Sequence, residues 1–181
     1  MISFIESLKE VCARLESAHI PYMISGSTAG NLYAQPRATN DVDIVIQIDE
    51  GRSGDLLNLF HEDFYISKEA VDDAFGRIGM LNIIQQASVI KFDLIILKMD
   101  DFSRSAFARR RKEIFEGGEF WFISLEDLVL QKLLWHKEGG SELQREDARR
   151  LILANRPRLN VNYCSEWADR LRIGELLKEL L

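Results

Sequence analysis

Two acidic residues, two positions apart, open the most regularly alternating segment of the chain. Asp41 and Asp43 fall on one side of a predicted strand over residues 41–48, and aliphatic residues fill the other side. Two carboxylates held this close repel each other, and burying them without a partner is costly. Because Mg²⁺ prefers hard carboxylate oxygens together with substrate phosphates, the pair predicts a magnesium site.

A third acid stands in a comparable setting. Asp93 lies within the predicted strand 89–97, which is apolar apart from one neighbouring lysine. If this strand lies beside the first, three carboxylates converge and can hold two metal ions, roughly 3.5–4 Å apart, for an in-line displacement at phosphorus. The structural alternative is that Asp41 merely begins its strand, Asp43 pairs with an arginine such as Arg37 and Asp93 lies at a sheet edge. We prefer that alternative for any single acid, and the metal site for the three together.

A short turn precedes the paired acids. Gly26 and Ser27 follow a predicted strand over residues 22–24 and precede a predicted helix over residues 29–34. Glycine lets the backbone come close to a ligand, and the start of a helix presents free N–H groups to phosphate oxygens. The pair alone is a weak signal. Placed one strand before the acids, it predicts a phosphate-binding turn.

Taken together, these residues resemble a known family. The segments that carry the resemblance are Gly26-Ser27, Arg37-Ala38-Thr39-Asn40-Asp41-Val42-Asp43-Ile44 and Phe92-Asp93-Leu94-Ile95. Their order is similar to that of the nucleotidyltransferase superfamily named after DNA polymerase beta. The Arg-x-Thr-x-Asp-x-Asp spacing is similar to small bacterial nucleotidyltransferases of the abortive-infection toxin type, and the lincosamide and aminoglycoside nucleotidyltransferases are more distant. Residues 124–128, Lys132 and residues 145–147 resemble the helical portion of those small proteins.

The resemblance implies a fold and an activity. The fold is an α/β (α+β) nucleotidyltransferase fold, a short mixed sheet flanked by helices with a C-terminal helical subregion. The activity is Mg²⁺-dependent transfer of a nucleoside monophosphate from an NTP to a hydroxyl acceptor, with pyrophosphate released. The acceptor is open among RNA such as tRNA, a protein and a small molecule, and a role as a toxin would add an antitoxin protein as a partner. The alternatives are a catalytically inactive nucleotide- or partner-binding module of the same fold, and an antibiotic nucleotidyltransferase.

The resemblance also implies roles for individual residues. Asp41 and Asp43 would bind two Mg²⁺ ions, and Asp93 would bind the catalytic ion and help to deprotonate the acceptor hydroxyl. The Gly26-Ser27 turn would cradle the β and γ phosphates. Arg37 and Thr39 would either hold phosphate or brace the acids.

Helical periodicity adds two residues to the candidate site. On a predicted helix over residues 124–137, Lys132 falls on the apolar face, and on the next helix Asp147 falls inward as well. Lysine is seldom fully buried without a partner. Two interpretations stay open: a structural ion pair that locks the two helices, and a lysine that reaches the triphosphate with Asp147 orienting it. Both can hold at once.

Composition and charge limit which other functions the sequence can have. The chain has 181 residues, with Lys plus Arg at 23 and Asp plus Glu at 29, so a net charge of −6 excludes a globally basic coat for nucleic acid. The basic run from Arg104 to Lys112 is either a solvated helix face or a local landing site for RNA. Two cysteines give no disulfide framework, and neither a signal peptide nor a membrane-spanning stretch is evident. We expect a soluble cytoplasmic protein with a core over residues 1–123 and a helical region over 124–181.

Overall fold

The computed structural model describes residues 2–39 and 41–181, with residues 77 and 78 described by backbone alone. In that part of the chain, seven strands form one mixed sheet in the order β3-β4-β5-β2-β1-β7-β6. The strands are β1 Tyr22–Ile24, β2 Asp41–Ile46, β3 Phe64–Tyr65, β4 Met80–Gln85, β5 Lys91–Ile96, β6 Arg111–Phe115 and β7 Gly118–Phe122.

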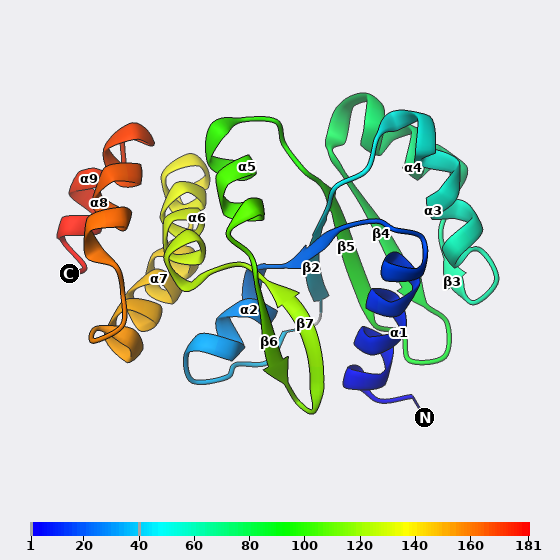
Figure 1. The fold of residues 1–181 in the computed structure, drawn as a ribbon, viewed down its shortest axis with the longest axis horizontal. Coiled ribbons are helices and arrows are strands. Elements are labelled where there is room, and N and C mark those ends of the chain that lie inside the picture. Colours follow the sequence, from blue (N-terminus) through cyan, green and yellow to red (C-terminus); the bar gives the residue numbers. More distant parts are fainter. Residues whose placement is uncertain (1, 40) are drawn as a thin grey trace.

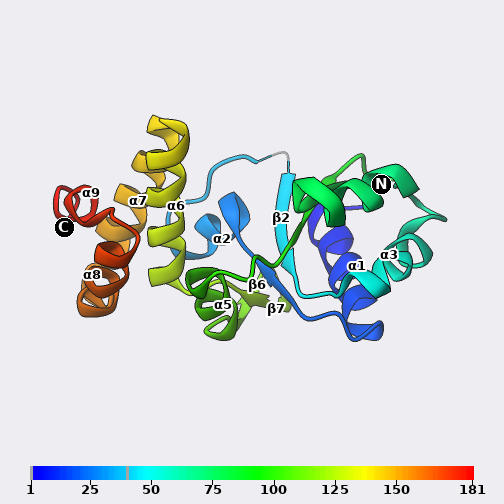
Figure 2. The same cartoon turned by 90° about the horizontal axis from the view of Figure 1, so that it is seen from above.

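Helices flank this sheet, as the sequence predicts. They are α1 Phe4–Ser17, α2 Gly26–Tyr33, α3 Ser53–Phe60, α4 Lys68–Asp73, α5 Asp101–Ala108, α6 Leu125–Gly139, α7 Glu142–Asn155, α8 Val161–Arg170 and α9 Gly174–Lys178. The helices α1, α3 and α4 gather at one end of the molecule, and α6 to α9 gather at the other (Figure 1). The view from above shows the same separation, with the β2 strand between the two groups (Figure 2). The predicted α/β fold with a short mixed sheet is confirmed.

The strands that carry the acids lie in the middle of the sheet. The β2 strand pairs parallel with β5 and antiparallel with β1. Val42, Ile44 and Ile46 are completely buried on one face of β2, as the alternation predicts. The other face carries the acids, and the register sets Asp43 directly opposite Asp93.

The first helix is fixed at both ends by polar contacts. Ser3 and Glu6 form the reciprocal N-terminal cap that the sequence pattern is typical of. Near the other end, Arg14 donates to the Leu59 carbonyl at 2.6 Å and to Asp63 Oδ1 at 2.8 Å. These contacts join α1 to the segment around α3, next to the end of the sheet that holds β3 and β4.

Three local predictions differ from the structure. Helix α2 begins at Gly26, not near residue 29, so Gly26 and Ser27 are its first turn. Ser141 and Gln144 have the spacing of a capping box before α7, but the Ser141 side chain makes no capping bond; its carbonyl instead lies 3.0 Å from His136 Nδ1. The basic run is not one helix face, because α5 ends at Ala108 and the β6–β7 hairpin begins at Arg111.

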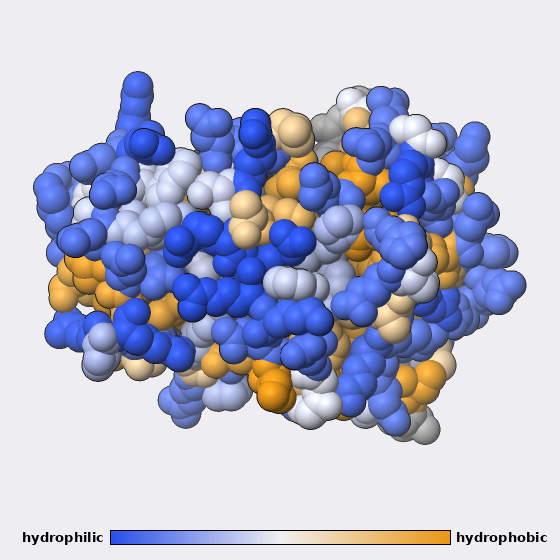
Figure 3. All heavy atoms as spheres, in the orientation of Figure 1, coloured by the Kyte–Doolittle hydropathy of each residue, from blue (hydrophilic) through white to orange (hydrophobic). Residues whose placement is uncertain are grey.

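The remaining features of the surface and the core agree with a globular chain. Both cysteines are buried and free. Among the described residues, every helix is too short or too polar to cross a bilayer. Hydrophilic side chains cover much of the face seen in Figure 1, with hydrophobic patches between them (Figure 3).

Candidate active site

Asp43 lies at the centre of the candidate site. Its carboxylate accepts no hydrogen bond from the residues that the structure describes, and Asp93 lies opposite it on β5. Burial is the main cause that raises the pKa of Asp43 to about 6; the charges of Asp41 and Asp93 add to it, and two lysines oppose it. Among the described residues, Asp43 has no ion-pair partner of its own.

A lysine joins the other two acids. Lys91 Nζ lies 3.0 Å from Asp93 Oδ2 and 3.6 Å from Asp41 Oδ2. The side-chain amide of Asn82 donates to the other oxygen of Asp93. In the described chain, no three His, Cys, Asp or Glu side chains gather closely enough to enclose a metal ion as they stand. The ammonium group of Lys91 therefore supplies part of the positive charge that the three acids require.

The residues present nevertheless fit a divalent cation. The donor set is made of hard carboxylate oxygens, which Mg²⁺ prefers. Asp41 and Asp43 lie on one face of β2 with Asp93 beside them on the neighbouring strand, and Asp43 has a raised pKa and an unused carboxylate. A bound cation would relieve the repulsion that raises this pKa.

The first residue of α2 must be glycine. Gly26 has φ +60°, and a Cβ atom placed on it would lie 1.8 Å from Asp43 Oδ2. Ser25 precedes it, and the Ser25 N–H donates to the Asp43 carbonyl at 2.9 Å. The start of α2 is thus packed directly against the central acid, so a ligand bound to the first N–H groups of this helix would lie next to Asp43.

Two residues of the loop before β2 brace their neighbours. Thr39 Oγ1 donates to Asp41 Oδ1 at 3.0 Å, which supports the bracing role among the two predicted for Thr39. Arg37 does not pair with Asp43, so that part of the structural alternative is wrong. Its Nη2 instead donates to Ser27 Oγ at 2.7 Å and to Asp147 Oδ2 at 3.1 Å.

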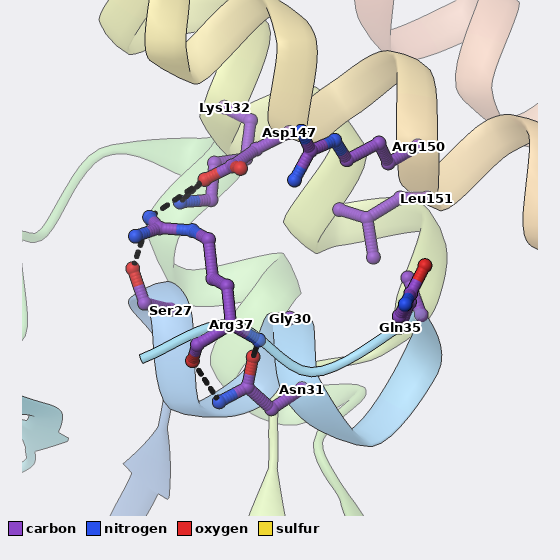
Figure 4. A pocket seen from close by; sticks show the side chains of 10 residues that line it. Ser27, Gly30, Asn31, Gln35, Arg37, Lys132, Asp147, Arg150 and Leu151 are labelled. Carbon is purple, nitrogen blue, oxygen red and sulfur yellow. Dashed lines mark hydrogen bonds and ion pairs between the residues drawn. The ribbon is translucent and has the colours of Figure 1, made fainter. Parts of the chain in front are cut away.

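Lys132 and Asp147 form the ion pair that helical periodicity predicts. Lys132 on α6 is only 1% exposed, and its Nζ lies 3.0 Å from Asp147 Oδ2 on α7. Figure 4 shows Arg37 and Lys132 approaching the same carboxylate, with Ser27 at the far side of Arg37. The charges of two cations thus converge on one acid next to the α2 turn. This geometry agrees with the structural interpretation and leaves the phosphate-binding one open.

Several of the candidate side chains line one open polar pocket. It has a volume of about 520 Å³ and is lined by the paired acids and by most of the phosphate-binding candidates; its walls include Ser27, Arg37, Asp41, Asp43 and Lys132. Trp135 also lines it, which sequence reasoning missed. The signal was present, since Trp135 follows Lys132 by three positions and so shares its helix face.

The basic run is largely engaged within the fold. Arg109 Nε lies 3.2 Å from Asp127 Oδ2. The Arg110 guanidinium packs 4.2 Å from the ring centre of Phe107, and Lys112 pairs with a glutamate of the same hairpin. These contacts reduce the charge that the run can offer to RNA, and the RNA-binding role stays a prediction.

Comparisons with solved structures identify the fold. An antigenic nucleotidyltransferase-like protein from Paracoccidioides brasiliensis is 23% identical, with a TM-score of 0.52 over 82% of this chain and 73% of that one. The antibiotic-resistance factor ANT(2″)-Ia is 13% identical, with a TM-score of 0.58 over 95% and 94% of the two chains. The lincosamide antibiotic adenylyltransferase LnuA, bound to lincomycin, is 13% identical, with a TM-score of 0.53 over 81% and 94%.

At these identities the likeness is one of fold, and the chain has a nucleotidyltransferase fold. No family model matches the sequence, and no curated protein matches it. The activity must therefore be argued from the site.

Proposed function

We propose that this protein is a Mg²⁺-dependent nucleotidyltransferase. The observation that carries the proposal is the position of Asp43, which faces Asp93 across two parallel strands and packs against the first residue of α2. Three acids and the start of a helix thus share one place in the sheet. The carboxylates could bind a divalent cation, and the N–H groups at the start of the helix could bind phosphate, so the site could hold a metal–nucleotide complex.

Each candidate residue has a role in this proposal. Asp41, Asp43 and Asp93 would hold two Mg²⁺ ions, which when bound neutralise charge on the triphosphate and promote ionisation of the attacking hydroxyl. Gly26 and Ser27 would bind the β and γ phosphates through backbone N–H groups. Arg37 and Lys132 would contact phosphate. Thr39 would brace Asp41, and Asp147 would orient Lys132.

The reaction follows as a balanced exchange at phosphorus. The acceptor oxygen forms a bond to the α-phosphorus while the bond from that phosphorus to the bridging oxygen of pyrophosphate breaks. The hydroxyl proton passes to the carboxylate of Asp93. The products are the nucleotidylated acceptor and pyrophosphate.

The experiment is transfer of label from each of the four common NTPs in the presence of Mg²⁺. Wild type should label an acceptor in a mixed pool of RNA, protein and small molecules. The Asp43→Asn variant should lose orders of magnitude in rate, because charge stabilisation at phosphorus depends on that carboxylate. Equal labelling by wild type and variant would remove the enzymatic proposal.

A second candidate is an inactive nucleotide-binding module of the same fold. The observation that favours it is the engagement of Lys91 with two of the three acids, because a resident ammonium competes with a metal ion. This candidate predicts thermal stabilisation by NTP without turnover. Labelled transfer that depends on Asp43 would exclude it.

The narrower classes stay proposals. The spacing of Arg37, Thr39, Asp41 and Asp43 supports the abortive-infection toxin type, which would bring an antitoxin partner. The fold neighbours ANT(2″)-Ia and LnuA support transfer to an antibiotic. We also keep the division between a core over residues 1–123 and a helical region over residues 124–181.

A further inference from the structure

A second cavity lies on the same sheet face as the acids. Val45 and Ile95 line it, and each follows an acid of the site, Asp43 or Asp93, by two positions on its strand. Because side chains two apart in a strand share a face, the cavity begins where the row of acids ends. Its volume is about 380 Å³, which is within the range of small-molecule sites.

One side chain belongs to both cavities. Trp135 of α6 lines the polar pocket and also this apolar groove. One helical turn earlier, Gln131 lines the groove and accepts a hydrogen bond of 2.7 Å from Ser25 Oγ, next to Gly26. The groove therefore adjoins the candidate active site.

The position of the groove suits the incoming acceptor. An in-line displacement requires the nucleophile to enter opposite the leaving pyrophosphate. The proposed phosphate contacts, Ser27, Arg37 and Lys132, line the polar pocket, whereas the groove is lined by the residues that follow Asp93 on β5 and by α5. Ile95 of the groove lies two positions after Asp93 on the same face of β5, so a hydroxyl held in the groove would lie beside the acids and not among these phosphate contacts.

The lining defines the chemistry of the occupant. It is largely apolar, and its hydrophobic members include Met23, Leu97, Phe102 and Leu134. Lys98 is its one basic residue, and the acids Asp100 and Glu138 lie at the same groove. Nucleic acid needs several cations for its phosphates, so this lining disfavours RNA and favours a compact molecule with an apolar body.

From these observations we infer that the groove binds the acceptor, and that the acceptor is a small molecule with an apolar ring or chain and a free hydroxyl group. This inference rests on the proposed function for the transfer step. The acceptor oxygen joins the α-phosphorus, pyrophosphate departs, and the proton passes to Asp93. Binding in the groove, however, requires neither nucleotide nor metal, so it can be measured separately.

The test is protein-observed NMR with a library of alicyclic and aromatic alcohols, with ATP and with a short RNA. Some library members should shift the amide signals of Leu97, Phe102 and Leu134 in wild type. The Ser103→Phe variant fills the groove from α5, and Leu134→Glu places a charge in it; each should weaken binding by about tenfold or more. The matched control is Leu153→Glu at an α7 position that is 45% exposed, and it should bind as wild type does.

The outcomes separate the two proposals. ATP should shift signals around Lys132 and Arg37 in wild type and in all three variants; failure of ATP to bind wild type would count against the proposed function alone. Library members that leave the groove signals unmoved, or that bind equally to both groove variants, would overturn the inference about the acceptor. Groove shifts produced by the RNA and not by the library would also overturn it.

Discussion

Replacement of Asp43 by asparagine should make the metal-free protein more stable. Asparagine keeps the shape of the side chain and removes its charge. In wild type that charge is partly buried beside two further carboxylates and has no hydrogen-bond donor among the described residues. The site is therefore expected to lower the free energy of unfolding of the apo protein in exchange for ligand binding.

The magnitude follows from the pKa of Asp43, which rises from 3.8 to about 6 on folding. A difference of about two units corresponds to about 3 kcal/mol between the two protonation states. Because the folded state binds this proton more tightly than the unfolded state, the stability of wild type falls as the pH rises from about 4 to about 6. The advantage of Asp43→Asn should thus be near zero at pH 4 and on the order of 3 kcal/mol at pH 8.

The assay is urea denaturation of both proteins in the presence of EDTA across this pH range. Titration with Mg²⁺ and a non-hydrolysable NTP should then stabilise wild type and leave the variant nearly unchanged, since only a ligand that binds the native state raises stability. The control is Asp55→Asn, which removes a surface ion pair of 2.8 Å with Arg52 and should change stability by about 1 kcal/mol or less.

An Asp43→Asn protein that is equal to or less stable than wild type at pH 8 would refute the reasoning. So would a difference between the two that does not change with pH. Either result would mean that another group already compensates the charge of Asp43, so that this carboxylate does not need a bound cation to stabilise it.

Three other substitutions test the surroundings. Lys132→Met should lower stability in urea denaturation by less than the about 3–5 kcal/mol that a stranded buried charge costs, because Arg37 still pairs with Asp147; a loss of that full size would contradict this. Gly26→Ala should abolish Mg²⁺-dependent thermal stabilisation, since its Cβ would lie 1.8 Å from Asp43 Oδ2; retained stabilisation would count against a tight turn. Lys91→Met should bind Mg²⁺ several-fold more tightly by calorimetry, because the resident ammonium no longer competes, and weaker binding would show that Lys91 helps to hold the ion.

Much of the fold was predictable because the relevant signals are local. Alternation defines β2, and the capping pair at Ser3 and Glu6 marks the start of α1. The pairing of β2 with β5 was predicted only as a condition of the acids converging, since the order of strands depends on contacts far apart in sequence. The start of α2 was misplaced because a helix at Gly26 needs a positive φ that only the tertiary contact with Asp43 explains.

In the candidate site, too, local patterns were predictable and long-range contacts were not. Lys132 and Asp147 could be placed inward from helical period alone, and the structure pairs them. The contact of Arg37 with Asp147 could not be predicted, because it joins residues 110 positions apart. Trp135 was passed over because a lone tryptophan on an amphipathic helix is typical of a core, and only the position of α6 relative to β1 and β2 gives it two cavities to line.

The distribution of charge across the site suggests how ligand binding is made reversible. In the structure, Lys91 pairs with Asp41 and Asp93, while Arg37 and Lys132 pair with Asp147. A triphosphate offers Arg37 and Lys132 a stronger partner, and two cations on one carboxylate allow one of them to leave without stranding the acid. Binding thus exchanges ion pairs and does not create them all anew, so its net free energy is smaller than the count of contacts implies. The nucleotidylated product, which lacks the β and γ phosphates, would make no such exchange and would depart.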